Sequence, residues 1–248
     1  MSEPVPAYAK LTQSLRVTGV RADGYHGIDA VMTTVTQPCD TVSVVPARSM
    51  ALSVVGPFAA GVPDDARNLA WRAAEAAGAT VLIEIVKNIP HGAGLGGGSA
   101  DAAAVLNALG ADEALGATIG ADVPFCMRGG AARVRGIGEI IESISMPAQW
   151  VVIATPPFGC VTADVYRAWD ELGGPHAEPN DLEPAAHHVE PRLAVFKAAI
   201  ARAAGAEPFL AGSGSSYAWA FADEADAESA RAQVATKVDA QTWVGRTS

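Results

Sequence analysis

The sequence predicts an α+β protein of two domains, residues 1–145 and 146–248. Strand and helix patterns intermix without a steady strand–helix–strand rhythm, which favours α+β over a doubly wound parallel sheet. The chain has 248 residues, enough for one large domain or two small ones with a substantial core. A new apolar stretch begins with "SMPAQWVVIATP", so we place the domain boundary just before it, near residue 145.

The first domain reads as β-rich and then helical. Four strands are expected from alternation and from Val and Thr content, within residues 10–20, 28–36, 40–46 and 50–56. A helix follows over 69–79, with Asp64 or Asp65 near its start, and then the clearest strand, 80–88. After a glycine-rich loop we expect a helix over 99–109, then a short helix, a turn and one or two strands within 115–139.

The second domain opens with a clear strand, "QWVVIATP". Helices are expected over 162–172, 191–205 and 224–237. Between the last two, "FLAGSGSSYAWAFAD" predicts two strands around a glycine-serine turn.

Composition limits the partners. The formal net charge of −10 argues against binding nucleic acid or an anionic membrane through a general basic field. Cys39, Cys126 and Cys160 are far apart and odd in number, which indicates reduced thiols in a cytoplasmic protein. The N-terminus has no signal-peptide pattern, and the longest apolar stretch, "WVVIATPPFGCV", is too short to cross a bilayer. We therefore expect no membrane partner.

The strongest chemical signal is "HGAGLGGGSADAAAVLNALG", residues 91–110, where a glycine-rich loop runs directly into a helix-forming segment. Glycine allows positive φ angles and close approach to the backbone, and a helix start offers unpaired N–H groups. Together they form an anion site, most often for phosphate.

The loop has three other interpretations. Gly92, Gly94 and Gly97 match the dinucleotide-binding pattern G-x-G-x-x-G, but the match lies mid-chain. That fold also needs an acidic residue at the end of a following strand, whereas Asp112 and Glu113 precede a helical stretch. A P-loop is excluded because no lysine follows the glycines. A tightly packed turn without a ligand is the remaining alternative.

The pattern P-x-G-x-G-L-G-G-G-S-A closely resembles the ATP-phosphate loop of the GHMP kinases, the superfamily of galactokinase, homoserine kinase, mevalonate kinase and phosphomevalonate kinase. The resemblance implies a two-domain fold with the ATP site and substrate cleft between the domains, and ATP with Mg²⁺ as cofactors. It implies that the Ser99 hydroxyl lies near the metal. The implied ATP-binding residues are Asn68, Lys87, Pro90, Gly92, Gly94, Leu95, Gly96, Gly97, Gly98 and Ser99.

Other segments narrow the resemblance to one branch of these kinases. "PAYAKL", "RADGYHG", "GADVPF", "PNDLEPAA" and "LAGSGSSYAWAF" match, in order, segments of the branch that phosphorylates 4-diphosphocytidyl-2-C-methyl-D-erythritol, a cytidine diphosphate-linked methylerythritol of the non-mevalonate isoprenoid pathway. The resemblance implies a kinase acting on the 2-hydroxyl of this small molecule, as a monomer or homodimer. It assigns catalysis to Lys10 and Asp122. Phosphoryl transfer needs positioning and charge neutralisation, which a lysine and a carboxylate beside the hydroxyl supply.

Substrate contacts are also implied by the resemblance. Tyr25 would stack on the cytosine and His26 would hydrogen-bond it, while Gly212 and Ser213 would close the site near the phosphates. Thr12 stands where this branch usually has asparagine, which removes a paired donor and acceptor at the substrate end. The segment before "GADVPF" is also short. Both departures keep two alternatives open: a GHMP kinase with another alcohol substrate, and a non-catalytic nucleotide-binding paralogue.

Overall fold

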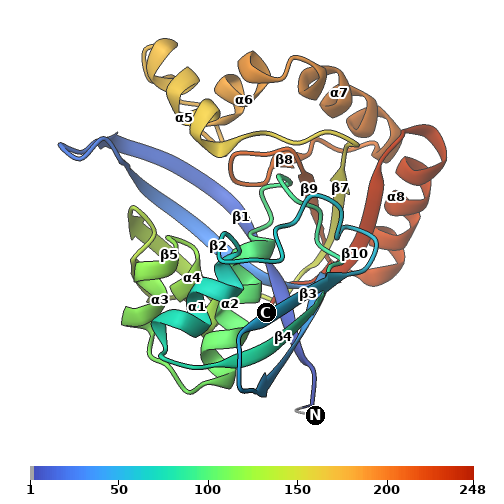
Figure 1. The fold of residues 1–248 in the computed structure, drawn as a ribbon. Helices are drawn as coiled ribbons and strands as arrows, with labels where there is room; N and C mark the ends of the chain where they lie inside the picture. Colours follow the sequence, from blue (N-terminus) through green and yellow to red (C-terminus); the bar gives the residue numbers. More distant parts are fainter. Residues whose placement is uncertain (1–2) are drawn as a thin grey trace. The chain divides into compact units, whose positions relative to one another are not determined.

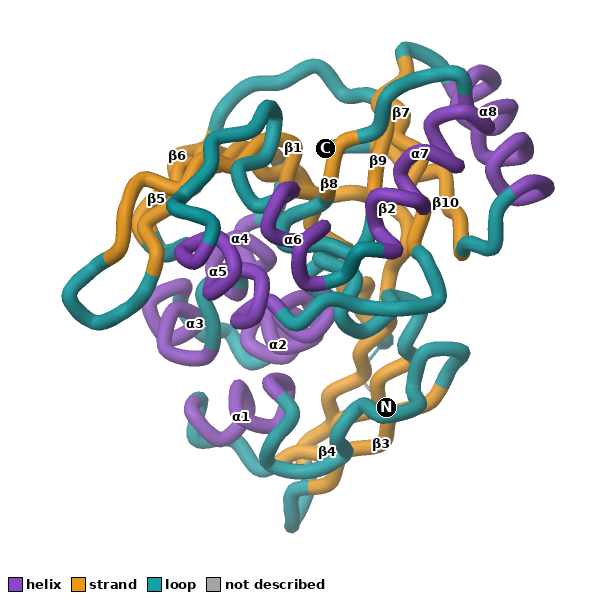
Figure 2. The backbone as a smooth tube through the Cα atoms, turned by 90° about the horizontal axis from the view of Figure 1, so that it is seen from above, coloured by secondary structure: helices purple, strands orange, loops and turns teal. Residues whose placement is uncertain are grey.

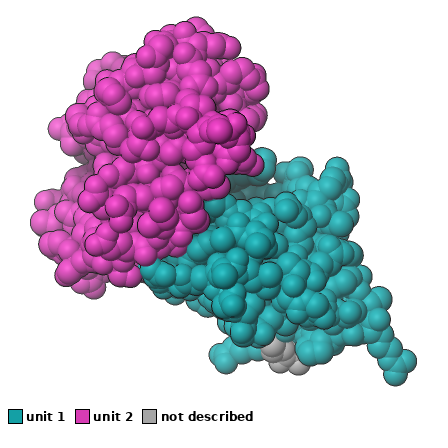
Figure 3. All heavy atoms as spheres, turned by 90° about the vertical axis from the view of Figure 1, so that its left-hand side faces the viewer, with its two compact units in different colours: residues 1–10, 38–91, 96–129 teal, residues 11–37, 92–95, 130–248 magenta. Residues whose placement is uncertain are grey.

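The computed structural model describes residues 3–248 and divides them into two compact units, each assembled from several stretches of chain (Figure 3). Unit 1 takes in the described part of Met1–Lys10 with Pro38–His91 and Gly96–Gly129, and unit 2 takes in Leu11–Gln37, Gly92–Leu95 and Gly130–Ser248. The predicted domains, 1–145 and 146–248, are consecutive, and their boundary stays a prediction. It falls in the connection between two strands, β6 (Ile140–Ser143) and β7 (Trp150–Thr155).

Two long strands contribute to both units. They are β1 (Val5–Val20) and β2 (His26–Pro46), which pair with each other. The sequence suggested two strands within the second of these, but the structure has one continuous strand that passes through Pro38.

Unit 1 pairs the C-terminal part of β2 with β4 (Val81–Val86) in antiparallel fashion, and β4 with β3 (Ala51–Val55) in parallel. Its helices, visible in Figure 1, are α1 (Leu69–Ala76), α2 (Gly97–Ala108), α3 (Glu113–Ile119) and α4 (Val123–Arg128). Helix α4 lies where the sequence indicated a turn. Helix α2 is buried throughout its middle, Ala100 to Leu106, because a run of alanines lets α1 and α4 pack closely on different sides. Figure 2 shows α2, α3 and α4 side by side.

Unit 2 pairs the N-terminal part of β2 with β5 (Ala131–Gly136), and β5 with β6 (Ile140–Ser143), both antiparallel. A second, antiparallel sheet has the order β10-β7-β9-β8. Its strands are β7 (Trp150–Thr155), β8 (Phe209–Leu210), β9 (Tyr217–Phe221) and β10 (Gln241–Arg246). The helices are α5 (Thr162–Glu171), α6 (Glu183–Val189), α7 (Arg192–Ala204) and α8 (Glu224–Lys237), of which α8 packs on β7 and β10.

The α+β class predicted from the sequence is confirmed. Among residues 3–248 all three cysteines are free thiols, and burial raises the pKa of Cys39 and Cys160 to about 11. No helix in this range is long and apolar enough to cross a membrane.

Candidate active site

The glycine-rich loop connects β4 to α2 and ends at Gly96, the residue before the helix. Gly96 has a φ angle of +70°. Two glycines are required by the packing of the protein itself. A Cβ on Gly94 (φ +76°) would lie 2.1 Å from the Ala211 carbonyl oxygen, and one on Gly96 would lie 2.7 Å from Cγ of Lys10. The loop backbone therefore runs directly against the aliphatic stem of Lys10 in unit 1.

The start of α2 has the properties of an anion site. No side chain caps its first turn, which contains Gly97, Gly98 and Ser99, so its first N–H groups have no capping partner among the described side chains. Together with the helix dipole, these groups fit a phosphate.

Lys10 and Asp122 form an ion pair within unit 1, with 3.4 Å between Nζ and Oδ2. The Lys10 side chain is 8% exposed and that of Asp122 is 30% exposed. Asp122 occupies the N-cap position of α4 without capping the helix through its side chain. Its carboxylate is thus directed to the ammonium group and remains partly open to solvent.

Asn68 is the N-cap of α1. Its Oδ1 accepts from the Ala70 N–H at 2.9 Å and its Nδ2 donates to the Pro63 carbonyl at 2.7 Å. Asp65 lies near this helix start as expected, but it does not cap the helix, because its carboxylate accepts from the Arg67 N–H. The contacts of Asn68 give it a structural role, and its role toward ATP stays a prediction.

Lys87 is buried in unit 1 between two carboxylates. Its Nζ lies 2.5 Å from Oδ2 of Asp40 and 2.6 Å from Oδ2 of Asp101, and the residue is 3% exposed. Burial raises the pKa of Asp101 to about 7, with the Asp40 charge adding to the effect and Lys87 opposing it. Burial alone would lower the pKa of Lys87, but the Asp101 and Asp40 charges outweigh it, so the pKa is raised. The predicted contact of Lys87 with ATP is untested.

His26 is surrounded by residues of α5 in unit 2. Its Nε2 lies 2.9 Å from Oδ1 of Asp170, and its ring centroid lies 4.8 Å from that of Tyr166 and 5.8 Å from that of Trp169. Tyr25 is 62% exposed. The sequence analysis missed these three α5 residues. The available signal was their helical spacing, because Trp169 and Asp170 follow Tyr166 by three and four positions.

The glycine-serine turn after β8 meets the glycine-rich loop within unit 2. The Ser215 N–H donates to the Gly92 carbonyl at 3.3 Å, and the Ser216 N–H donates to the Ala93 carbonyl at 3.1 Å. Ser213 Oγ lies 2.9 Å from Oγ1 of Thr162. The two glycine segments singled out from the sequence are therefore neighbours.

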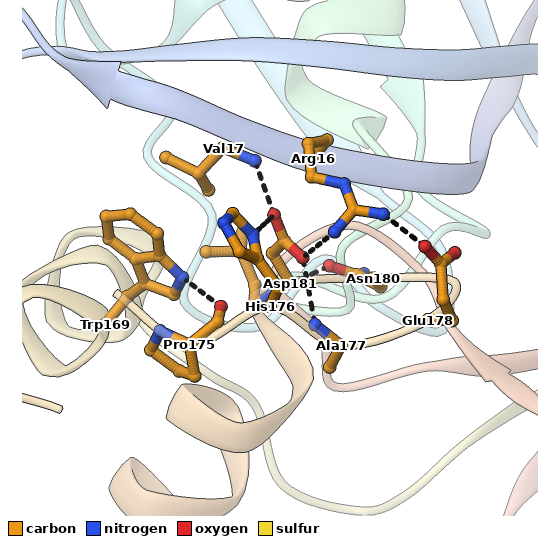
Figure 4. Close-up of polar contacts among 10 residues, drawn as sticks. Arg16, Val17, Trp169, Pro175, His176, Ala177, Glu178, Asn180 and Asp181 are labelled. Carbon is orange, nitrogen blue, oxygen red and sulfur yellow. Dashed lines mark hydrogen bonds and ion pairs between the residues drawn. The ribbon is translucent and has the colours of Figure 1, made fainter. Parts of the chain in front are cut away.

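Asn180 fixes the position of this turn from another segment of unit 2, the "PND" motif. Its Nδ2 donates to the carbonyls of Leu210 at 3.0 Å and Gly212 at 2.7 Å, while its Oδ1 accepts from the Leu182 N–H. The next residue, Asp181, is held by a separate set of polar contacts (Figure 4). The motif was recognised in the sequence, but its connection to Gly212 was not.

Thr12 and Gln13 are adjacent in β1, and their side chains lie in different surroundings. Thr12 is fully buried, whereas the Gln13 amide donates to Oγ1 of Thr33 at 3.4 Å. Gln13 is thus occupied elsewhere in unit 2, as strand alternation predicts.

A metal would find few protein ligands here. Among the described residues, no group of three or more His, Cys, Asp and Glu side chains could hold an ion.

Comparison with known proteins first defines the class. The family model described as "GHMP kinases N terminal domain" matches residues 68–130, which include the loop, α2 and Asp122. A homoserine kinase from Cytophaga hutchinsonii has a TM-score of 0.65 at 18% identity, covering 100% of this chain and 95% of that chain, a likeness of fold. The fold is that of a GHMP kinase.

Closer relatives define the family. A solved 4-(cytidine 5'-diphospho)-2C-methyl-D-erythritol kinase has a TM-score of 0.79 and 32% identity, covering 99% of both chains. The 4-diphosphocytidyl-2-C-methyl-D-erythritol kinase of Paracoccus denitrificans is 38% identical over 92% of this chain and 90% of its own. That of Cereibacter sphaeroides is 36% identical over 90% and 91%. The chain belongs to the 4-diphosphocytidyl-2-C-methyl-D-erythritol kinase family, whose superfamily uses ATP as phosphoryl donor.

Proposed function

We propose that the protein transfers the γ-phosphoryl group of ATP to the 2-hydroxyl of 4-diphosphocytidyl-2-C-methyl-D-erythritol. The observation that carries the mechanism is the Lys10–Asp122 pair, 3.4 Å apart, with Lys10 packed against loop residue Gly96. The family membership supports the choice of substrate.

In the proposed reaction the substrate oxygen bonds to the γ-phosphorus, the bond from that phosphorus to the bridging oxygen breaks, and ADP leaves. Asp122 accepts or orients the hydroxyl proton. The ammonium of Lys10 stabilises the negative charge that develops on the attacking oxygen and the transferring group. The uncapped amides of Gly97, Gly98 and Ser99 bind phosphate oxygens.

The remaining assignments complete the proposal. Mg²⁺ neutralises phosphate charge when bound, and Ser99 is the residue of this chain proposed to lie beside it. His26 and Tyr25 contact the cytosine, and the location is the cytoplasm. Because Asp170 faces Nε2 of His26, the imidazole is oriented before the base arrives.

The test is ADP release by the purified protein with ATP, Mg²⁺ and the cytidylyl substrate, with homoserine and mevalonate as competing candidates. We expect turnover on the cytidylyl compound alone. Turnover on another alcohol would replace this proposal with a GHMP kinase of different substrate, and ATP binding without turnover on any of them would replace it with a non-catalytic paralogue.

The variant Asp122→Asn should lower kcat by about 10²- to 10⁴-fold, since it removes the proton acceptor while keeping the shape of the side chain. ATP affinity, measured by calorimetry, should change little. Asp112→Asn is the matched control, because Asp112 is also at a helix N-cap of unit 1 but uses its side chain to cap α3. Equal turnover by Asp122→Asn and this control would refute the mechanism.

A further inference from the structure

Three ionisable side chains are buried together in unit 1 and pair with one another. Asp40, Lys87 and Asp101 are 0%, 3% and 1% exposed, and they comprise two acidic groups and one basic group. Breaking such a buried cluster is costly, yet replacing it with apolar residues is often neutral or stabilising. General stability is therefore a weak explanation for its presence.

The cluster is attached to the chain as it enters the glycine-rich loop. Asp40 Oδ1 accepts from the backbone N–H of Asn88 at 2.5 Å and of Ile89 at 2.7 Å. The Asn88 side chain donates to the Cys39 carbonyl at 2.9 Å. Strand β2 thus fixes the last residues before Pro90.

The same cluster is attached to the chain as it leaves the loop. Lys87 Nζ bonds to Asp101, the fifth residue of α2, and a Cβ on Gly97 would lie 2.9 Å from that Nζ. A cation beside the first turn of a helix is opposed by the helix dipole. The two carboxylates hold it there, and its charge favours an anion at the same helix start.

We infer that Asp40, Lys87 and Asp101 are positioning residues, which join the two ends of the loop and so set the geometry of the amides that bind phosphate. Lys87 then acts on nucleotide affinity through the loop, without touching the nucleoside. This inference rests on the proposed role of the loop in ATP binding.

The arrangement of Lys87 supports an indirect role over direct contact. Both carboxylates lie within 2.6 Å of its Nζ, and the side chain is 4% exposed. Two of the three N–H donors of the ammonium group are directed to these carboxylates, and little of the side chain is open to a ligand that would take the third. Leaving either carboxylate would leave a buried acidic group without its partner.

The experiment compares the variants Lys87→Met, Asp101→Ala and Asp101→Asn with Asp112→Asn as control. Three quantities are measured on the full chain: the Kd for ATP, the KM and kcat, and backbone amide exchange without nucleotide. We expect Lys87→Met and Asp101→Ala to raise the Kd and KM for ATP about tenfold, with kcat at saturating ATP nearly unchanged. Asp101→Asn, which retains an acceptor for Lys87, should have a smaller effect.

Amide exchange separates the explanations. We expect faster exchange at residues 88–89 and 97–101 in the nucleotide-free variants, with wild-type protection retained in α3 and α4. Weaker ATP binding with unchanged exchange there would mean direct contact of Lys87 with the ligand and would overturn the inference. Uniformly faster exchange across unit 1 would mean general destabilisation and would also overturn it.

Two further outcomes separate this inference from the proposed function. Wild-type affinity for ATP in all the variants would overturn the positioning role alone. Absence of ATP binding by the wild-type protein would refute the proposed function and, with it, this inference.

Discussion

Two fully buried aspartates, one in each compact unit, are held in opposite ways. Asp181 in unit 2 accepts from the N–H groups of Val17 at 2.8 Å and Ala177 at 3.0 Å, with Arg16 and His176 also bonded to it (Figure 4). Asp101 in unit 1 bonds to Lys87 through Oδ2, while its Oδ1 has no hydrogen-bond partner among the described residues.

The difference separates a carboxylate that organises the fold from one that the fold tolerates. Main-chain donors satisfy both oxygens of Asp181, so its burial fixes β1 against residues 176–181. The burial of Asp101 is poorly compensated, which is why its pKa is raised. Buried groups with perturbed pKa values gather at functional sites, and Asp101 lies on the helix that begins at the glycine-rich loop.

Removing the well-satisfied carboxylate should have the largest effect on stability. Asp181→Ala leaves the N–H groups of Val17 and Ala177 unpaired, so we expect a loss of about 3–5 kcal/mol in the free energy of unfolding, measured by urea denaturation. The control is Glu178→Ala. Glu178 also pairs with Arg16, but its side chain is 78% exposed, so it should cost about 1 kcal/mol or less. Equal losses for the two variants would show that burial and main-chain donors do not distinguish Asp181.

The sequence predicted those parts of the fold that depend on local pattern. The loop and α2 follow from glycines before a run of alanines, and β4 and β7 follow from apolar runs bounded by proline. Helix α6 and strand β10 were not expected. The first is a seven-residue helix with Pro184 in its first turn, and the second is stabilised by antiparallel pairing with β7. A helix of this length is too short to show a clear period, and the pairing of β10 depends on a strand far away in the sequence.

The candidate site was predictable where a contiguous motif carries it. The loop and Asp122 each lie in such a motif, and the structure places Lys10 beside both. The surroundings of His26 were not predictable, because Asp170 lies 144 positions after His26 in the chain. The same holds for Asp40 and Lys87, 47 positions apart, whose pairing depends on how β2 and β4 align.

Neutralising the poorly satisfied carboxylate should have a smaller effect of opposite sign. The pKa of Asp101 is about 7 in the folded protein against an ordinary value of 3.8, so the folded state holds this proton more tightly. Its contribution to stability is fully present below about pH 4 and is lost as the pH rises to about 7. Asp101→Asn removes this loss. We therefore expect the free energy of unfolding of the variant, relative to wild type, to increase by at least about 1 kcal/mol from pH 5 to pH 8.

Urea denaturation at pH 5 and pH 8 measures this difference, and Asp112→Asn reports the effect of removing a carboxylate at a helix N-cap of the same unit. A gain that is equal at the two pH values would mean that Asp101 is fully ionised in both. The variant should bind ATP more weakly while being more stable at pH 8. That combination is expected of a buried charge retained for function.

The smallest effect should come from the most exposed donor to Asp181. The His176 side chain is 63% exposed, and its Nδ1 lies 3.0 Å from the same Oδ2 that accepts from the Val17 N–H. Because His176→Ala leaves that oxygen bonded to the main chain, we expect a loss of about 0.5 kcal/mol or less, measured by urea denaturation at pH 7. A loss approaching that of Asp181→Ala would mean that the imidazole, and not the main chain, holds the carboxylate. Asp181 would then resemble Asp101, whose bonded oxygen depends on a single side chain.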